Sequence, residues 1–388
     1  MGRTALICGA GVAGSTLAYW LSRRGFEVTV VERAAGQRSS GNPVDVKGPA
    51  VAVASQMGIM PQLRAARSRV SQMTFVSASG KKVARIGLGA FQGGAGDLEV
   101  EIPRAELASI LLAAAGDGAE FLWGDTITAL ADHDEGVEVT FETSPARRFD
   151  IVVGADGLHS VVRRLIFGPE SGFVRHMGMY VATLRIDEPF GSEREVIIYN
   201  TPGRAVSVHP TRGHAIAALI FRHGQVQDMD HRDTARHKRL VAQVFSGAGW
   251  RVPELLDRVT GSDDLYFDAV SQVQLPRWWQ RRVAVAGDAA SCLSLFGDGS
   301  TLAMAGAYTL AHELARWADS AEPLPGKAFA RYEMAHRAVV APKLNGYRLG
   351  AAMLLPATRA GILTRNAIAR AMPALTAMSS LRRTKTPA

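Results

Sequence analysis

The chain has 388 residues, of which 44 are basic and 36 acidic, so its formal net charge is +8 at pH 7. Hydrophobic residues make up 47% and charged residues 21%, which is typical of a globular protein and excludes disorder over most of the length. The two cysteines, Cys8 and Cys292, are too few for a disulfide framework or a cysteine metal site. We expect roughly two or three domains at this length.

The positive charge is dispersed and forms no basic run interleaved with aromatic residues, so we expect no nucleic-acid partner. The apolar stretch 349–357 contains Pro356 and is too short for the roughly 18 residues of a membrane span. Arginines at helical spacing in 344–378 favour a helix packed across two domains over a membrane-surface helix. With few cysteines and no signal-peptide pattern, we expect a cytoplasmic protein.

A glycine-rich turn follows an apolar strand near the start of the sequence. The strand is predicted at 6–8, and the turn after it has the spacing G-x-G-x-x-G, with its glycines at Gly9, Gly11 and Gly14. A helix predicted at 13–24 begins within the turn, so its N-terminal N–H groups and its dipole favour a bound anion. Strand, glycines and helix together indicate a site for the pyrophosphate of a dinucleotide.

An acidic residue follows at the distance that a ribose-binding carboxylate requires. A second strand is predicted at 28–31, and Glu32 comes after it, 18 positions beyond Gly14 (32 − 14 = 18). A ribose 2′-phosphate about 4 Å from this carboxylate would be repelled by several kcal/mol. We therefore expect FAD or NAD, rather than NADP, at this site.

Helical and extended patterns alternate in the next part of the chain. Helices are predicted at 49–57 and 99–115, a strand pair at 73–77 and 82–86, and further strands within 121–139. Two more apolar strands then end in a glycine and an aspartate. They are predicted at 151–155, which runs into Asp156, and at 282–286, which runs into Asp288.

The segment between these two strands has a different pattern. Its short connections indicate antiparallel pairing, and hence a layer separate from the parallel sheet, to which we assign substrate binding. The predicted strands are 180–186, 195–199, 205–209 and 214–221. The chain after 302 is predicted to be largely helical to about Met378.

Three junctions between a strand and a loop carry a glycine and an aspartate or a glycine-rich turn. In chain order they are 9–14 (GAGVAG), 156–163 (DGLHSVVR) and 287–290 (GDAA). With these motifs the chain resembles the single-component FAD-dependent aromatic hydroxylases, the group that contains p-hydroxybenzoate hydroxylase and the tetracycline-modifying monooxygenases. The resemblance covers nearly the whole chain. It implies an α/β fold with a Rossmann-like FAD-binding domain on a parallel sheet, a mostly antiparallel substrate domain and a C-terminal helical segment.

We assign the domain bounds on this pattern. The FAD-binding domain is predicted at 1–72, 99–170 and 281–340, the substrate domain at 73–98 and 171–280, and the C-terminal helices and tail at 341–388. The resemblance also implies a tightly but non-covalently bound FAD, and NADPH or NADH as a transient co-substrate. Reduced flavin would add O2 at C4a, and this hydroperoxide would hydroxylate an aromatic or polyketide-like small molecule. Both a monomer and a homodimer are compatible with the pattern.

Individual residues have alternative interpretations. Asp288 is expected to accept hydrogen bonds from the ribityl chain, whereas an isolated Gly-Asp pair is more often an ordinary turn. Asp156 and Arg163 resemble the family motif that serves both FAD and pyridine-nucleotide binding, and the alternative for Asp156 is a cap of the following helix. Arg104 matches an arginine that reaches the flavin, or it is a solvated residue at a helix start. The loop 297–301 precedes a predicted helix, so its N–H groups can stabilise negative charge on the flavin when the ring is reduced.

The residues predicted to bind the cofactor are Gly9, Gly11, Ala13, Gly14, Glu32, Arg33, Arg38, Asp45, Arg104, Asp156, Gly287, Asp288, Gly299, Ser300 and Thr301. No side chain is assigned a catalytic role, because the flavin carries the chemistry. No metal is expected, since His231, Asp233 and His237 belong to a charged, surface-type helix.

The region 291–301 departs from the family pattern. Ser291 replaces the usual histidine, prolines are absent at Ser294 and Leu295, and the loop is about one residue short in comparison with the family. A flavin-binding sensor or docking module without turnover is therefore an alternative. A halogenase would need a Trp-x-Trp-x-Ile-Pro segment, which the chain lacks, and a reductase is supported only by the apolar C-terminal helices.

Overall fold

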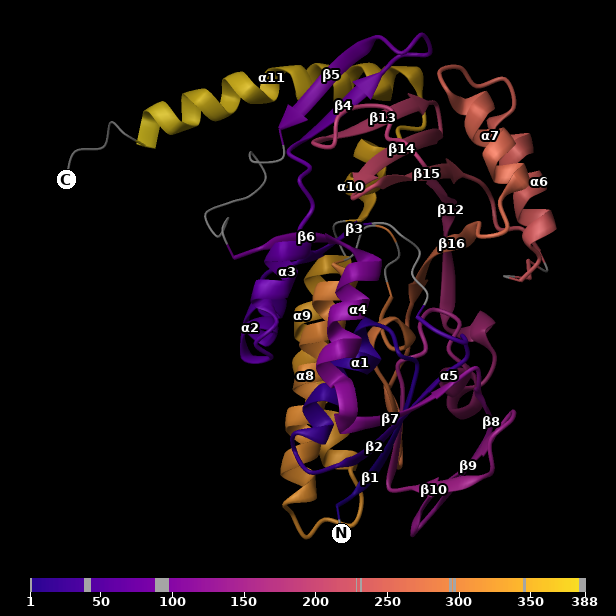
Figure 1. Ribbon diagram of the computed structural model, residues 1–388, viewed down its shortest axis with the longest axis vertical. Coiled ribbons are helices and arrows are strands. Elements are labelled where there is room, and N and C mark those ends of the chain that lie inside the picture. The colour runs from indigo at the N-terminus through magenta and orange to yellow at the C-terminus, as the bar shows by residue number, and fades with distance from the viewer. Residues whose placement is uncertain are drawn as a thin grey trace.

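Two sheets lie at opposite ends of the long axis of the molecule in this computed structural model (Figure 1). The structure describes residues 2–37, 43–87, 98–227, 229–230, 232–292, 295, 298–344 and 347–383. The predictions made for Arg38, His231 and Ser294 lie outside these residues. None of the described helices is both long and apolar enough to cross a membrane.

The first sheet has six strands in the order β17-β18-β11-β1-β2-β7. Its members are β1 (Thr4–Cys8), β2 (Glu27–Glu32), β7 (Ala119–Trp123), β11 (Ile151–Gly154), β17 (Trp279–Gln280) and β18 (Val283–Val285). All neighbours are parallel except β17 and β18. Strands such as β1 and β11 are almost wholly apolar because both faces of this sheet are covered.

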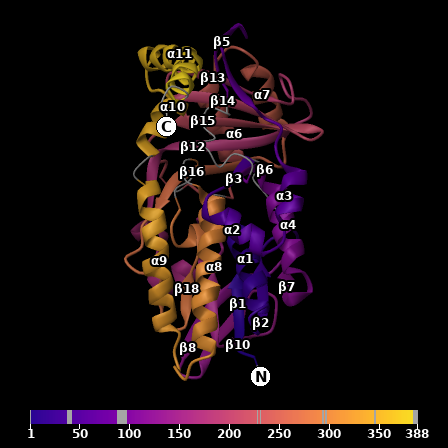
Figure 2. The ribbon, with the colours of Figure 1, turned by 90° about the vertical axis from the view of Figure 1, so that its left-hand side faces the viewer.

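Helices cover one face of the parallel sheet, and a three-stranded sheet packs into the same core on the other (Figure 1). The helices are α1 (Val12–Ser22), α4 (Arg104–Ala115), α8 (Gly299–Ala318) and α9 (Gly326–Leu344). The small sheet is formed by β8 (Ile127–His133), β9 (Gly136–Phe141) and β10 (Arg147–Phe149). Figure 2 shows α8 and α9 side by side along one flank.

The second sheet has seven strands in the order β16-β12-β15-β14-β13-β4-β5. They are β4 (Gln72–Val76), β5 (Lys82–Gly87), β12 (Val174–Ile186), β13 (Glu195–Thr201), β14 (Arg204–Thr211), β15 (His214–Arg222) and β16 (Tyr266–Val273). Only β13 and β4 pair in parallel. The predicted fold class is thereby confirmed, whereas the domain bounds stay predictions.

Helices also flank the second sheet. On one side lie α6 (Thr234–Phe245) and α7 (Val252–Gly261), and on the other lie α10 (Tyr347–Leu354) and α11 (Arg359–Arg383). The remaining short elements are α2 (Pro49–Gln56), α3 (Met60–Ala66), α5 (Val161–Phe167), η2 (Gly116–Gly118), η3 (Glu170–Gly172) and η4 (Gly287–Ala289).

The helix predicted at 99–115 is wrong over its first part. There the chain forms β6 (Val100–Pro103), which pairs antiparallel with β3 (Pro43–Val46), and α4 begins only after it. Val100 and Ile102 are buried while the residues between and after them are less so, which is the alternation of a strand. Apolar residues at this short spacing fit the period of a helix as well as that of a strand. Pairing with the distant strand β3 makes this segment a strand.

Candidate functional site

A cleft of about 570 Å³ runs along the carboxyl ends of the parallel strands and reaches the second sheet. Eleven of the fifteen predicted cofactor-binding residues line it: Gly9, Gly11, Ala13, Glu32, Arg33, Asp45, Arg104, Asp156, Asp288, Gly299 and Ser300. Gly14, Gly287 and Thr301 do not line it. The carboxyl edge of a parallel sheet is where ligands bind in folds of this kind.

The three glycines of the first turn have different surroundings. A Cβ on Gly9 would lie 2.5 Å from the carbonyl oxygen of Ala155, and one on Gly14 would lie 1.8 Å from that of Gly9. A Cβ on Gly11 would meet no protein atom within 4 Å. The outer two glycines therefore allow the backbone to pack, while Gly11 borders open space at the N-terminus of α1. This arrangement fits a pyrophosphate.

The carboxylate of Glu32 is held in the cleft by two backbone N–H groups. Ala10 donates to Oε2 and Ala34 donates to Oε1, each over 2.9 Å. These bonds fix the side chain and leave lone pairs on both oxygens for further donors. The geometry fits the hydroxyl groups of a ribose.

Asp156 caps the helix that follows it. Ser160 Oγ donates to Oδ1 over 2.5 Å, and the N–H groups of Val161 and Val162 donate to Oδ2 over 2.7 and 3.1 Å. Burial raises the pKa of this carboxyl, and these donors oppose the rise. The alternative interpretation of Asp156, a helix cap, is what these contacts show, and a contact with the cofactor stays a prediction.

The turn η4 brings Asp288 to the cleft. Gly287 has a φ of +58°, and a Cβ there would lie 2.8 Å from Cβ of Ala13, so the third junction packs directly on the first. Burial raises the pKa of Asp288, while Arg104 and the thiol of Cys292 oppose the rise. A desolvated carboxyl at this point favours a ligand that brings hydroxyl donors. Arg104 is exposed and lines the cleft, so both interpretations of it stay open.

Charged side chains that the sequence did not single out surround the N-terminus of α8. Asp298 forms ion pairs with Lys47 (2.7 Å) and Lys343 (2.6 Å), and although burial opposes it, these lysines hold the pKa of Asp298 below its usual value. The hydroxyls of Ser300 and Thr301 donate to the carbonyl oxygen of Asp45 over 2.9 and 3.0 Å. They hold β3 against α8 and leave the backbone N–H groups of the first turn for a ligand. No sequence spacing connects these distant residues.

The strand pair next to this helix carries two facing carboxyl groups. Glu101 on β6 pairs in register with Asp45 on β3. Burial, and secondarily the charge of Asp45, raises the pKa of Glu101 from 4.5 to about 7, while Ser68 opposes the rise. Because the folded pKa exceeds the unfolded one, ionised Glu101 costs stability above pH 4.5, and the cost is complete above pH 7.

We expect Glu101→Gln to raise the free energy of unfolding by about 1–3 kcal/mol at pH 8 and to leave it nearly unchanged at pH 4. Urea unfolding at the two pH values measures this difference. Glu135→Gln is the control, since the side chain of Glu135 is 81% exposed. An equal effect of Glu101→Gln at both pH values would contradict the assignment of the cost to ionisation.

A family described as "FAD binding domain" matches residues 3–338. A flavin-dependent monooxygenase of Legionella longbeachae serogroup 1 (strain NSW150) is 35% identical over 338 residues, which cover 86% of this chain and 85% of that protein. The crystal structure of tetracycline destructase Tet(51) superposes with a TM-score of 0.82 at 29% identity, over 95% of this chain and 96% of that one. Klebsiella pneumoniae HpxO, complexed with FAD and uric acid, gives 0.73 at 19% identity over 95% and 92%, a likeness of fold alone.

Proposed function

The chain belongs to the FAD-binding domain family and is a flavin-dependent monooxygenase, and from this premise we propose that it uses NADPH or NADH and O2 to hydroxylate an aromatic or polyketide-like small molecule. The single observation that supports the proposal most is the cleft in which the three glycine-containing junctions converge. The likeness to tetracycline destructase, an enzyme named for a polycyclic substrate, supports the choice of a polyketide-like substrate.

The protein's own part is to bind and orient FAD and the substrate and to exclude water from the site. Glu32 would accept hydrogen bonds from the adenosine ribose, and the N-terminus of α1, bordered by Gly11, would hold the pyrophosphate. Asp288 would accept hydrogen bonds from ribityl hydroxyls. Bound FAD supplies the redox chemistry, in which reducing equivalents from the nicotinamide activate O2 for transfer of one oxygen atom to the substrate.

The first turn of α8 would hold the flavin ring at the other end of the cleft. Its N–H groups and its dipole would stabilise negative charge on the bound ring. The ion pairs of Asp298 with Lys47 and Lys343 neutralise an acid that would otherwise oppose this effect. The second sheet would close the site against water.

The absorbance spectrum of the purified protein is the first test, and we expect the bands of an oxidised flavin. Phenolic and polycyclic aromatic compounds, tetracycline among them, are then screened for faster consumption of NADPH or NADH in air. Mass spectrometry with ¹⁸O2 distinguishes the alternatives, because a hydroxylase places the label in the product and a reductase does not. Protein that binds no flavin, or that never oxidises the nicotinamide, would refute the proposal.

Asp288→Ala is expected to weaken FAD retention about tenfold, because a desolvated hydrogen-bond acceptor for the ribityl chain is lost. Equilibrium dialysis of FAD against the apoprotein measures the change. The control is Asp134→Ala, whose side chain is 98% exposed and lies outside the cleft lining. Unchanged FAD affinity in Asp288→Ala would contradict the assigned role.

A further inference from the structure

The second sheet contributes few of the described residues that line the cleft. They are Val181 on β12 and Tyr266 and Asp268 on β16, whereas the rest of the lining comes from the cofactor side. We call these three residues the substrate corner. A substrate that lies on this sheet and reaches the flavin must therefore pass or contact the substrate corner. The position of β16 relative to the parallel sheet consequently sets the distance between substrate and cofactor.

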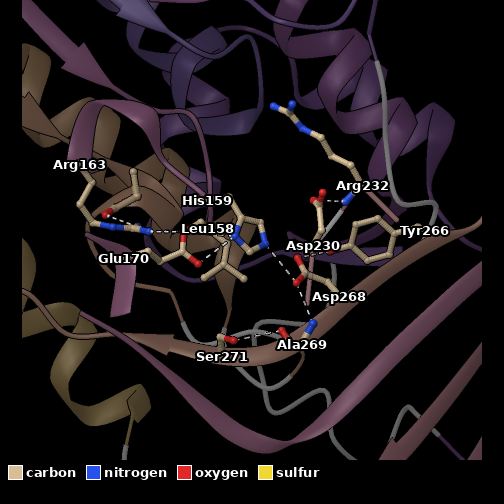
Figure 3. Close-up of polar contacts among 11 residues, drawn as sticks. Leu158, His159, Arg163, Glu170, Asp230, Arg232, Tyr266, Asp268, Ala269 and Ser271 are labelled. Carbon is tan, nitrogen blue, oxygen red and sulfur yellow. Dashed lines mark hydrogen bonds and ion pairs between the residues drawn. The ribbon is translucent and has the colours of Figure 1, made fainter. Parts of the chain in front are cut away.

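His159 ties β16 to the cofactor side of the cleft (Figure 3). It lies in the loop between β11 and α5, with its Nδ1 3.0 Å from Oε1 of Glu170 and its Nε2 3.2 Å from Oδ1 of Asp268. Both ring nitrogens can donate only when the imidazole is protonated. Although burial opposes ionisation, the two carboxylates raise the pKa of His159 to about 10.

Both ends of this bridge are fixed. On one side, Arg163 contacts Glu170 over 3.5 Å and donates from its buried guanidinium to the carbonyl oxygen of Ala289, in the turn that carries Asp288. On the other side, Asp268 accepts from its neighbour's backbone, Ala269 N–H, over 2.7 Å and from the hydroxyl of Tyr266 over 3.3 Å (Figure 3). One polar chain thus joins the flavin-side turn to the substrate corner.

Besides its pairing with β12, β16 is attached to the cofactor side at its far end. The N–H of Val273 donates to the carbonyl oxygen of Cys292 over 3.0 Å, and the chain continues directly into β17 and β18. Asp268 lies five positions earlier on the strand (273 − 268 = 5). The residues around Asp268 pair with β12 of the same sheet, and His159 therefore links this part of β16 to the cofactor side of the cleft.

We propose that His159 is a positioning residue, which clasps β16 to the cofactor layer and thereby keeps the substrate corner closed during oxygen transfer. This inference rests on the proposed function. In coupled turnover NAD(P)H, H⁺, O2 and substrate give NAD(P)⁺, hydroxylated product and water. When the corner opens and water enters, the same two electrons reduce O2 to H2O2, so NAD(P)H + H⁺ + O2 gives NAD(P)⁺ + H2O2.

The test compares His159→Asn, Asp268→Asn and the double variant with the parent holoenzyme. The probe is the compound that stimulates NADPH or NADH consumption most in the screen described above. We expect the ratio of H2O2 to hydroxylated product to rise about three- to tenfold in each single variant, at unchanged FAD content, since a charged hydrogen bond is lost. The double variant is expected to be no worse than either single one, because the two residues act through each other.

Asp187→Asn is the matched control, since it makes the same chemical change at an exposed ion pair of Asp187 with Arg258, neither of which lines the cleft. We call the His159–Asp268 contact the clasp. A peroxide-to-product ratio that stays at the parent value in both single variants, or that rises equally in Asp187→Asn, would overturn the proposal that this contact keeps the substrate corner closed. Loss of flavin or of nicotinamide oxidation in the parent itself would count against the proposed function instead.

Hydrogen exchange of the FAD-loaded protein tests the clasp without turnover. In His159→Asn we expect amides at 266–270 to exchange several-fold faster, while those of β1 and β2 exchange at the parent rate. Unchanged exchange rates at 266–270 would overturn the inference, and this result does not depend on which substrate the enzyme uses.

Discussion

Gly11→Ala is expected to fold as the parent protein does and to lose FAD. Gly11 caps α1 in an extended conformation (φ −77°, ψ −168°) that alanine also adopts, and an added Cβ meets no protein atom within 4 Å. The methyl group would instead enter the cleft beside the first N–H groups of the helix, where the pyrophosphate must lie. Lost phosphate contacts of this kind predict FAD binding weakened about a hundredfold.

Two measurements separate the effects on fold and on cofactor. Guanidinium unfolding of the apoprotein should agree with the parent within about 0.5 kcal/mol. Flavin fluorescence titration should show the weakened binding. FAD affinity at the parent level would place the pyrophosphate elsewhere and refute the assignment of this turn.

Gly14→Ala is expected to have the opposite profile, with most of the folding stability lost. Its Cβ would lie 1.8 Å from the carbonyl oxygen of Gly9 and 3.4 Å from the side chain of Ile7. The nearest atom belongs to the backbone, so no side-chain rotation relieves the clash, and α1 must move away from β1. Overpacking of this severity costs about 3 kcal/mol or more out of a typical total of roughly 5–15 kcal/mol.

Circular dichroism during guanidinium unfolding of the apoprotein tests this expectation without reference to the cofactor. Gly36→Ala is the control, because that glycine is exposed and its added Cβ also meets nothing within 4 Å. A Gly14→Ala apoprotein as stable as Gly36→Ala would show that the helix tolerates displacement from the strand.

The first βαβ unit was predictable because its contacts are local. Strands expected at 6–8 and 28–31 appear as Thr4–Cys8 and Glu27–Glu32, with the helix between them at Val12–Ser22. The glycines, the helix and the acid all lie within one unit, so their spacing alone places them on one edge of the sheet.

The clasp was not predictable for the opposite reason. His159 stands within the motif that carries the family resemblance, but Asp268 lies 109 positions away, on a strand whose register depends on β12. Alternation along β16 puts Tyr266 and Asp268 on one face, yet the sequence does not say which face meets the cleft. The ion pairs of Asp298 were missed similarly, since they join the N-cap of α8 to the residue after β3 and to α9.

The order of strands in the parallel sheet has a consequence for how the protein is made. β1 pairs with β2 on one edge but receives its other neighbour, β11, only from residues 151–154, and β11 in turn receives β18 from residues 283–285. As the chain leaves the ribosome, the edge of β1 stays uncovered while more than a hundred residues are added. The cleft also needs Asp288 and Gly299, so we expect FAD, which stabilises only a folded binding site, to bind only after these residues have been added.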